Sequence, residues 1–482
     1  MRVFRNAFWL TSGRVAGDLS SFVLFVAISR SFGPATTGEY SFSFALASIL
    51  AFLGSGGYDE YGTSLYARAT DQAARRRIWA DVLTAQYVQL SFAVVFFAVF
   101  LAITGGMRAR VSVIVELSVL LSCQYLSRTF FIPSMASQDM KAPALIDFAC
   151  RFAAIGFALG AIWIAGASLP ALLIGFPIGG AVMVVLAARN AAAHGVSLRP
   201  HGDVKRIKQT LRSISTFTGC ELLGQFYVRT DFLLIALLIG DVEVGLYATN
   251  MKFVEYGVIP LYLLGLAAYP SLTRAAAYDP KAFRGSVREL ARLMFFLAGW
   301  LAVGLFCLVP LLITPIFGAS FARAADILPW FAALALFKAG DNTIYRVIYS
   351  MRRPSIYLLG MLIGTAVTIV LNFILIPRFG LVGAVIAAMA SVGVVITVCV
   401  ALLGVSLRPG VMVGALLRTG AALVATAAVL IGVGRLELAP WIAALAACAA
   451  YPIFGVAAGL LPHPGRSMLH AEIRAPAETP PA

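Results

Sequence analysis

The sequence predicts an all-α integral membrane protein with about fourteen transmembrane helices. Of its 482 residues, 60% are hydrophobic and only 12% are charged, whereas about a quarter of the residues in a typical soluble domain are charged. The mean hydropathy is +0.89. The apolar segments are continuous and about 20 residues long, as a membrane-spanning helix requires. They lack the ten-residue alternation that is typical of barrel strands.

The apolar segments form two sets of six, followed by a final pair. The first set covers residues 7–32, 38–66, 79–105, 111–136, 143–166 and 168–188. After a polar connector at 189–210, the second set covers residues 213–239, 244–272, 289–316, 324–348, 355–377 and 380–405. The final pair lies at 413–434 and 439–461.

This pattern predicts two parallel six-helix lobes, at 1–205 and 206–405, two additional transmembrane helices at 406–462 and a disordered cytoplasmic tail at 463–482. The tail is rich in proline and has too little apolar surface to fold. The N-terminal run MRVFRNAFWL begins like a signal peptide. Because Arg14 and Asp18 interrupt the apolar stretch that follows, we expect it to form the first span instead.

Basic residues are concentrated in alternate loops. One set of loops carries clusters such as 75–77 and 352–353, whereas the opposite loops contain few arginines. Cytoplasmic loops are enriched in Lys and Arg, so both termini are predicted to be cytoplasmic. The same bias accounts for the net charge of +15. No soluble stretch is long enough to form a nucleic-acid-binding domain.

A glycine pattern occurs twice. Gly33 and Gly38 flank a short turn in FGPATTGEY, and Gly240 and Gly245 flank one in IGDVEVGLY. Each glycine of the second pattern follows its counterpart in the first by 207 residues, which indicates an internal repeat. Short loops also attract glycine for other reasons. Each half contains an even number of spans, so the repeat is parallel. The substrate path is then expected between the halves.

Charged side chains within the spans indicate a polar interior. An ionised side chain at the centre of a lipid-facing helix costs about 2.5–3.5 kcal/mol, so such residues usually face protein or water. The candidate substrate-binding cations are Arg14, Arg229, Lys252 and Lys338. Facing one lumen, they would attract phosphate or another polyanion. Structural ion pairs or snorkelling are the alternative, and are at least as good an explanation for Asp147–Arg151 and Arg346.

Intramembrane carboxylates are the candidates for ion coupling. They are Asp18, Asp59, Glu221, Asp231 and Glu255. The sequence has no P-loop, no GxSxG motif and no large outer loop for an acid–base pair, so we do not expect an enzyme. Transport would draw on a H⁺ or Na⁺ gradient, the membrane potential or the substrate gradient. The six cysteines lie in apolar segments without CxxC spacing, and the four histidines lie in loops or the tail, so neither cofactor nor metal is expected.

Four motifs, in this order, resemble a known family. They are Phe32-Gly33-Pro34 with Gly38-Glu39-Tyr40; Arg229-Thr230-Asp231 with Gly245-Leu246-Tyr247 and Tyr269-Pro270; Gly318, Phe321, Ala324 and Leu328; and Asn372, Pro377, Gly380 and Gly383-Ala384. Over residues 5–460 the chain resembles the polysaccharide flippases of the Wzx type, in the multidrug/oligosaccharidyl-lipid/polysaccharide exporter superfamily.

This resemblance implies two lobes that rock by alternating access around a cationic lumen in the bacterial inner membrane. The implied cargo is an undecaprenyl-pyrophosphate-linked oligosaccharide for a surface glycan such as exopolysaccharide or the O-antigen of lipopolysaccharide. A polysaccharide polymerase and a chain-length regulator are the expected protein partners, besides membrane lipid.

Four alternatives remain open at the level of sequence. One is a pure scaffold role, for which many intramembrane charges would be expensive to keep. A flippase for the peptidoglycan lipid precursor would have the same helix count. A cation-coupled multidrug exporter would usually have about twelve helices and an acidic lumen, so the final pair of spans and the basic intramembrane residues count against it. A membrane polymerase or ligase would need a large outer loop, which this chain lacks.

Overall fold

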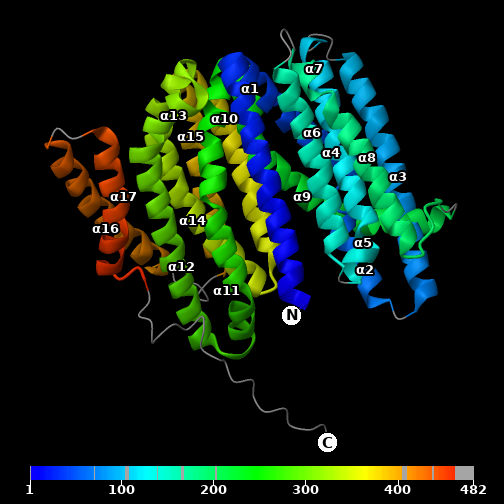
Figure 1. Cartoon of the computed structure of the whole chain (residues 1–482). Coiled ribbons are helices and arrows are strands. Elements are labelled where there is room, and N and C mark those ends of the chain that lie inside the picture. Colours follow the sequence, from blue (N-terminus) through cyan, green and yellow to red (C-terminus); the bar gives the residue numbers. More distant parts are fainter. Residues whose placement is uncertain are drawn as a thin grey trace, which may run out of the picture. The chain divides into compact units, whose positions relative to one another are not determined.

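The computed structural model describes residues 2–461 apart from 70, 104–107, 138, 164–167, 201–202, 404–409 and 437–438; it also leaves undescribed the side chains of 2–16, 55, 60, 100–103, 108–109 and 216–217. These residues are almost entirely helical, and no strand occurs among them (Figure 1). The chain divides into two compact units, Met1–Ala236 and Leu237–Ala482. The predicted all-α membrane fold is confirmed.

Unit 1 contains nine helices among its described residues. They are α1 (Arg2–Ser55), α2 (Tyr58–Arg68), α3 (Gln72–Ile103), α4 (Arg108–Phe130), α5 (Ile132–Ala136), α6 (Lys141–Ile162), α7 (Leu169–Leu173), α8 (Gly175–Ala193) and α9 (Val204–Leu238). One apolar core joins α1, α4, α6 and α7 through buried residues such as Ile28, Leu117, Ala158 and Leu172. A second core surrounds Trp79 on α3.

Helix α1 contains two spans that meet at Gly33, where the backbone is non-helical. The Thr37 hydroxyl donates to the Ser29 hydroxyl oxygen over 3.1 Å. Residues eight positions apart in a continuous helix would be separated by about 12 Å along its axis. The short bond therefore requires the chain to reverse direction at Gly33, as predicted for the boundary between the first two spans.

Unit 2 contains α10 (Asp241–Gly257), α11 (Ile259–Tyr278), α12 (Pro280–Val303), the π-helix η2 (Gly304–Leu308), α13 (Val309–Phe317), the 3-10 helix η3 (Ala319–Ile327), α14 (Leu328–Ser350), α15 (Pro354–Leu403), α16 (Gly410–Gly434) and α17 (Pro440–Ala457). Helix α15 is interrupted at Gly380. The Ser391 hydroxyl donates to the Gly364 carbonyl over 2.8 Å, which shows that the two parts of α15 lie side by side.

Eleven segments among the described residues are long and apolar enough to cross a membrane. This number treats α1 and α15 as one segment each and omits α9, which carries Glu221, Arg229 and Asp231. When α1 and α15 are divided at their glycine turns and α9 is included, the described residues contain fourteen candidate crossings. The chain is therefore a multi-pass membrane protein.

The polar connector and the start of α9 contact α3 through a hydrogen bond and an ion pair. The Trp79 indole Nε1 donates to the Ser197 carbonyl over 2.7 Å, and Arg206 Nη2 lies 2.6 Å from the Asp81 carboxylate. Further along α9, the Thr218 hydroxyl donates to the Gly56 carbonyl. These contacts place α9 with unit 1. The predicted lobe boundaries at 205 and 405 stay predictions, and the predicted tail lies outside the described residues.

The last two helices pack on α12. Gly299 on α12 has no side chain, and a Cβ there would overlap the Tyr451 ring of α17 and approach Thr419 of α16. Buried Phe296 and Tyr451 form an aromatic contact with ring centroids 5.8 Å apart. The small residue thus allows α12 to approach both helices closely.

Candidate functional site

Charged residues of unit 1 gather around Tyr125 on α4. The charges of Arg128, Glu221, Arg229 and Asp59 all act on the Tyr125 phenol. They come from three helices, because Asp59 belongs to α2 and Glu221 and Arg229 belong to α9. The structure therefore brings together three of the residues predicted from sequence. It also adds Arg128, whose guanidinium carbon lies 5.4 Å from the centre of the Tyr125 ring.

Arg229 lies against aromatic residues of α1. Its guanidinium carbon is 5.1 Å from the centre of the Phe44 ring, and its charge acts on the Tyr40 phenol. Tyr40 and Phe44 are themselves stacked, with ring centroids 6.2 Å apart. A guanidinium held over an aromatic face keeps its charge and its planar set of donors. This geometry suits recognition of an anionic group such as a phosphate.

The other predicted residues of unit 1 are only partly placed. Asp231 is 8% exposed. Asp18 is half-buried in α1, and both carboxylates interact with other parts of the protein. The side chain of Arg14 lies outside the described residues.

In unit 2, Lys252 is paired with Glu255. The ammonium nitrogen lies 2.8 Å from the carboxylate, one helical turn along α10, and the two side chains are 26% and 30% exposed. Lys252 also lies 6.0 Å from the centre of the Tyr256 ring. A candidate cation and a candidate carboxylate thus neutralise each other. A polyanion that binds Lys252 would have to share or displace this pair.

Lys338 belongs to a second polar cluster, at α14. Its charge acts on Asp341, which is 8% exposed and accepts a hydrogen bond of 2.9 Å from the Tyr357 hydroxyl. Arg346, one to two turns further along, lies between the rings of Tyr262 and Tyr345, at 4.8 and 5.2 Å.

The sequence analysis did not identify the aromatic residues of the α14 cluster. The rings of Tyr345, Tyr349 and Tyr357 contact one another, with centroids 4.3 to 6.5 Å apart. Tyr345 and Tyr349 are four residues apart on α14, whereas Tyr357 lies on α15. The spacing of the first two is the signal that could have revealed their shared helix face.

Glu116 was also missed. It is half-buried in α4, and its Oε2 atom is buried without a hydrogen-bond partner among the described residues. Burying a charged oxygen without a partner is costly, so Glu116 is a further candidate for binding a proton or a metal cation in transit. Its signal in the sequence is that it is the sole acidic residue of the apolar run at 111–130.

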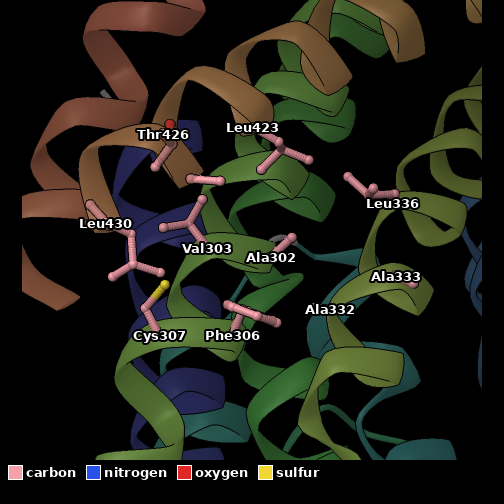
Figure 2. A pocket seen from close by; sticks show the side chains of 12 residues that line it. Ala302, Val303, Phe306, Cys307, Ala332, Ala333, Leu336, Leu423, Thr426 and Leu430 are labelled. Atoms are coloured by element: carbon pink, nitrogen blue, oxygen red, sulfur yellow. The ribbon is translucent and has the colours of Figure 1, made fainter. Parts of the chain in front are cut away.

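An apolar cavity of about 220 Å³ lies where the last two helices meet α12 and α14 (Figure 2). Its lining residues are Ala302, Val303, Phe306, Cys307, Ala332, Ala333, Leu336, Leu423, Thr426, Ala427, Leu430 and Ala447. The one hydroxyl among them, that of Thr426, donates to the Ala422 carbonyl of its own helix. The cavity therefore offers hydrocarbon contacts and suits a lipid chain.

The described residues contain no cluster of three or more His, Cys, Asp or Glu side chains that could hold a metal ion. The six cysteines are free thiols.

The solved structures that this chain resembles are membrane transporters. The lipid II flippase MurJ in an inward closed conformation matches with a TM-score of 0.69 and 13% identity, covering 94% of this chain and 98% of that chain. An inward-facing multidrug resistance MATE family transporter of the MOP superfamily matches with a TM-score of 0.60 and 12% identity, covering 84% and 95%. A MATE transporter of Vibrio cholerae, VcmN, matches with a TM-score of 0.57 and 13% identity, covering 83% and 96%.

These similarities define the class: the chain has the all-α membrane transporter fold of MurJ and the MATE proteins. The family model for polysaccharide biosynthesis proteins matches residues 3–276, which is more than half of the chain. The chain therefore belongs to the polysaccharide biosynthesis protein family. No curated protein matches it significantly.

Proposed function

We propose that this protein is a flippase that moves an undecaprenyl-pyrophosphate-linked oligosaccharide across the bacterial inner membrane for export of a surface polysaccharide. Transport proceeds by alternating access through the cationic lumen that the sequence predicts. Both termini lie in the cytoplasm. No bond of the cargo is made or broken, and reorientation of the lobes exposes the head group on the outer face.

The observation that carries this proposal is the pairing of intramembrane cations with aromatic rings, in a member of the polysaccharide biosynthesis family. Arg229 lies over Phe44, and Lys252 lies near Tyr256. Cations bind pyrophosphate oxygens, and aromatic faces can pack against sugar rings. Capture of the pyrophosphate by Arg14, Arg229, Lys252 and Lys338 would position the oligosaccharide for transfer.

The apolar cavity of unit 2 supports a lipid-linked cargo. A polyprenyl chain is too apolar to cross with the sugar through a polar path, so it remains in the bilayer or in a hydrocarbon groove. The cavity between α12, α14 and α16 meets this need, because its lining is almost entirely apolar. A water-soluble cargo would leave it without a role.

Two other cargoes are the alternatives. The peptidoglycan lipid precursor carries the same pyrophosphate and a similar lipid chain, and the similarity to MurJ favours it as the second candidate. A cation-coupled drug exporter is favoured by the MATE-like fold, but it gives no role to Arg229 beside its aromatic partners. Coupling to H⁺ or Na⁺ through Asp18, Asp59, Glu221, Asp231 or Glu255 fits any of the three.

The pool of lipid-linked glycan in cells that lack the gene tests the proposal. We expect undecaprenyl-pyrophosphate oligosaccharide to accumulate on the cytoplasmic face while surface polysaccharide is lost. Arg229→Ala should fail to restore export at normal protein levels, whereas Arg378→Ala, at an exposed turn, should restore it. Lysis with normal surface glycan would instead identify the peptidoglycan precursor as cargo. A change in drug sensitivity alone would contradict the flippase.

A further inference from the structure

Three arginines converge on one cavity at the beginning of α12 and α16. The cavity has a volume of about 300 Å³ and is lined by Arg288 and Arg292 of α12 and Arg418 of α16. Gly410 and Gly414, on the same face of α16 as Arg418, also line it. No carboxylate is among the described residues that line this cavity.

The arrangement concentrates positive charge. Arg288 and Arg292 are four residues apart and lie on the same face of α12. The positive charges of Arg288 and Arg418 act on Arg292, and the Glu289 carboxylate acts on it in the opposite sense. Like charges at short range repel one another, and an anion bound between them would reverse this repulsion.

The guanidinium groups of these arginines also have N–H hydrogen-bond donors available for a ligand. Neither Arg288 nor Arg292 makes a side-chain hydrogen bond or ion pair with another described residue. Arg418 uses one nitrogen, Nη1, to donate to the Gly459 carbonyl over 3.0 Å, which fixes its position. Guanidinium groups bind phosphate oxygens in a bidentate manner. The missing side chains at Gly410 and Gly414 leave room for such a group.

The surroundings of the cavity are apolar on the side of α16. Val413 and Leu417, which flank Gly414 and Arg418, are 52% and 68% exposed. They lie in the first two turns of a helix that is apolar enough to span the membrane. A lipid whose phosphate occupied the cavity could therefore place its acyl chain against these residues.

We propose that Arg288, Arg292 and Arg418 form a phosphate-binding site at the membrane rim of unit 2, occupied either by the head group of an anionic lipid or by a soluble phosphate. The site is formed by α12 and α16, which carry none of the charged residues assigned to cargo capture. It therefore stands independently of the proposed function.

Thermal unfolding of the purified full-length protein in a neutral detergent tests this site. Phosphatidylglycerol, phosphatidylcholine, inorganic phosphate and sodium chloride of equal ionic strength are added separately. A phosphate ligand near saturation is expected to raise the Tm by about 2–4 °C. If phosphatidylglycerol alone gives the rise, a lipid head group is the ligand; if inorganic phosphate gives it too, the site accepts soluble phosphate.

Matched variants decide whether the three arginines cause the shift. Arg292→Gln and Arg288→Gln should each fold, since neither side chain is bonded to another described residue, and each should remove the rise. Arg435→Gln is the control, because Arg435 is exposed just after the end of α16 and does not line this cavity. An equal rise with phosphatidylcholine, no rise with either phosphate source, or a rise that persists in both variants would overturn the proposal.

Discussion

Gly33 and Gly240 adopt the same backbone conformation although they are 207 residues apart. Their φ and ψ angles are 79° and −175° at Gly33 and 94° and 178° at Gly240. Gly33 lies at the reversal within α1, Gly240 is the N-cap of α10, and each is the first glycine of the repeated pattern. Matching conformations at matching positions agree with an internal repeat. The conformation is not specific to the repeat, because Gly318, between α13 and η3, also adopts φ 101° and ψ 166°.

Alanine at Gly33 or Gly240 is expected to destabilise the protein by about 1–3 kcal/mol, because L side chains rarely adopt such a φ. A Cβ would meet nothing within 4 Å at either position, so the cost comes from the backbone alone. Gly156→Ala is the matched control, since Gly156 on α6 has equally open space and no positive φ. Thermal unfolding in detergent should show lower Tm values for the first two variants only. Equal Tm values for all three variants would show that the backbone conformation at Gly33 and Gly240 does not require glycine.

Much of the fold could be predicted from the sequence because apolar length is a strong signal. Fourteen crossings were predicted, including the reversals at Gly33 and Gly380, where glycine interrupts otherwise continuous helices. The placement of α9 with unit 1 could not be predicted in this way, because it depends on contacts such as Arg206–Asp81, whose residues are 125 positions apart. Hydrophobic periodicity contains no information about such distant pairs.

The candidate site could be predicted only as a set of residue types. Arg229 and Lys252 could be identified as candidates because placing an ionised side chain in lipid costs free energy. It could not show that Lys252 is neutralised by Glu255 or that Arg229 lies on Phe44. A helix places residues three and four apart on the same face, but side-chain rotamers decide which of them pair.

The Lys252–Glu255 pair can be tested by exchanging its charges. Lys252→Ala should lower glycan export. The double exchange Lys252→Glu with Glu255→Lys should restore an ion pair and the wild-type Tm but leave export low, because the cation has moved by one turn. Surface glycan and Tm are measured on the same variants. Full recovery of export in the double variant would assign the pair a structural role.

Because the Arg229 guanidinium lies over the Phe44 ring, we expect that a positive charge alone at this position is insufficient for full glycan export. Arg229→Lys keeps the charge but loses the planar guanidinium over Phe44. Export at limiting protein levels should fall between those of the wild type and Arg229→Ala. Phe44→Leu should lower export by a factor between about 2 and 30, the equivalent of a lost cation–π contact of about 0.5–2 kcal/mol. Wild-type export in Arg229→Lys and Phe44→Leu would show that the stacking is incidental.

The apolar cavity of unit 2 predicts that filling it will block a lipid-linked cargo. Ala427→Phe places a ring inside the cavity, whereas Val424→Phe enlarges a side chain on the outer surface of the same helix, where Val424 is 73% exposed. Both variants should retain the fold, because neither position is buried. We expect Ala427→Phe to lower export and to reduce photo-crosslinking of a polyprenyl pyrophosphate probe to α16, and Val424→Phe to do neither. If both variants crosslink and export like the wild type, the lipid chain does not use this cavity and must remain in the bilayer throughout transport.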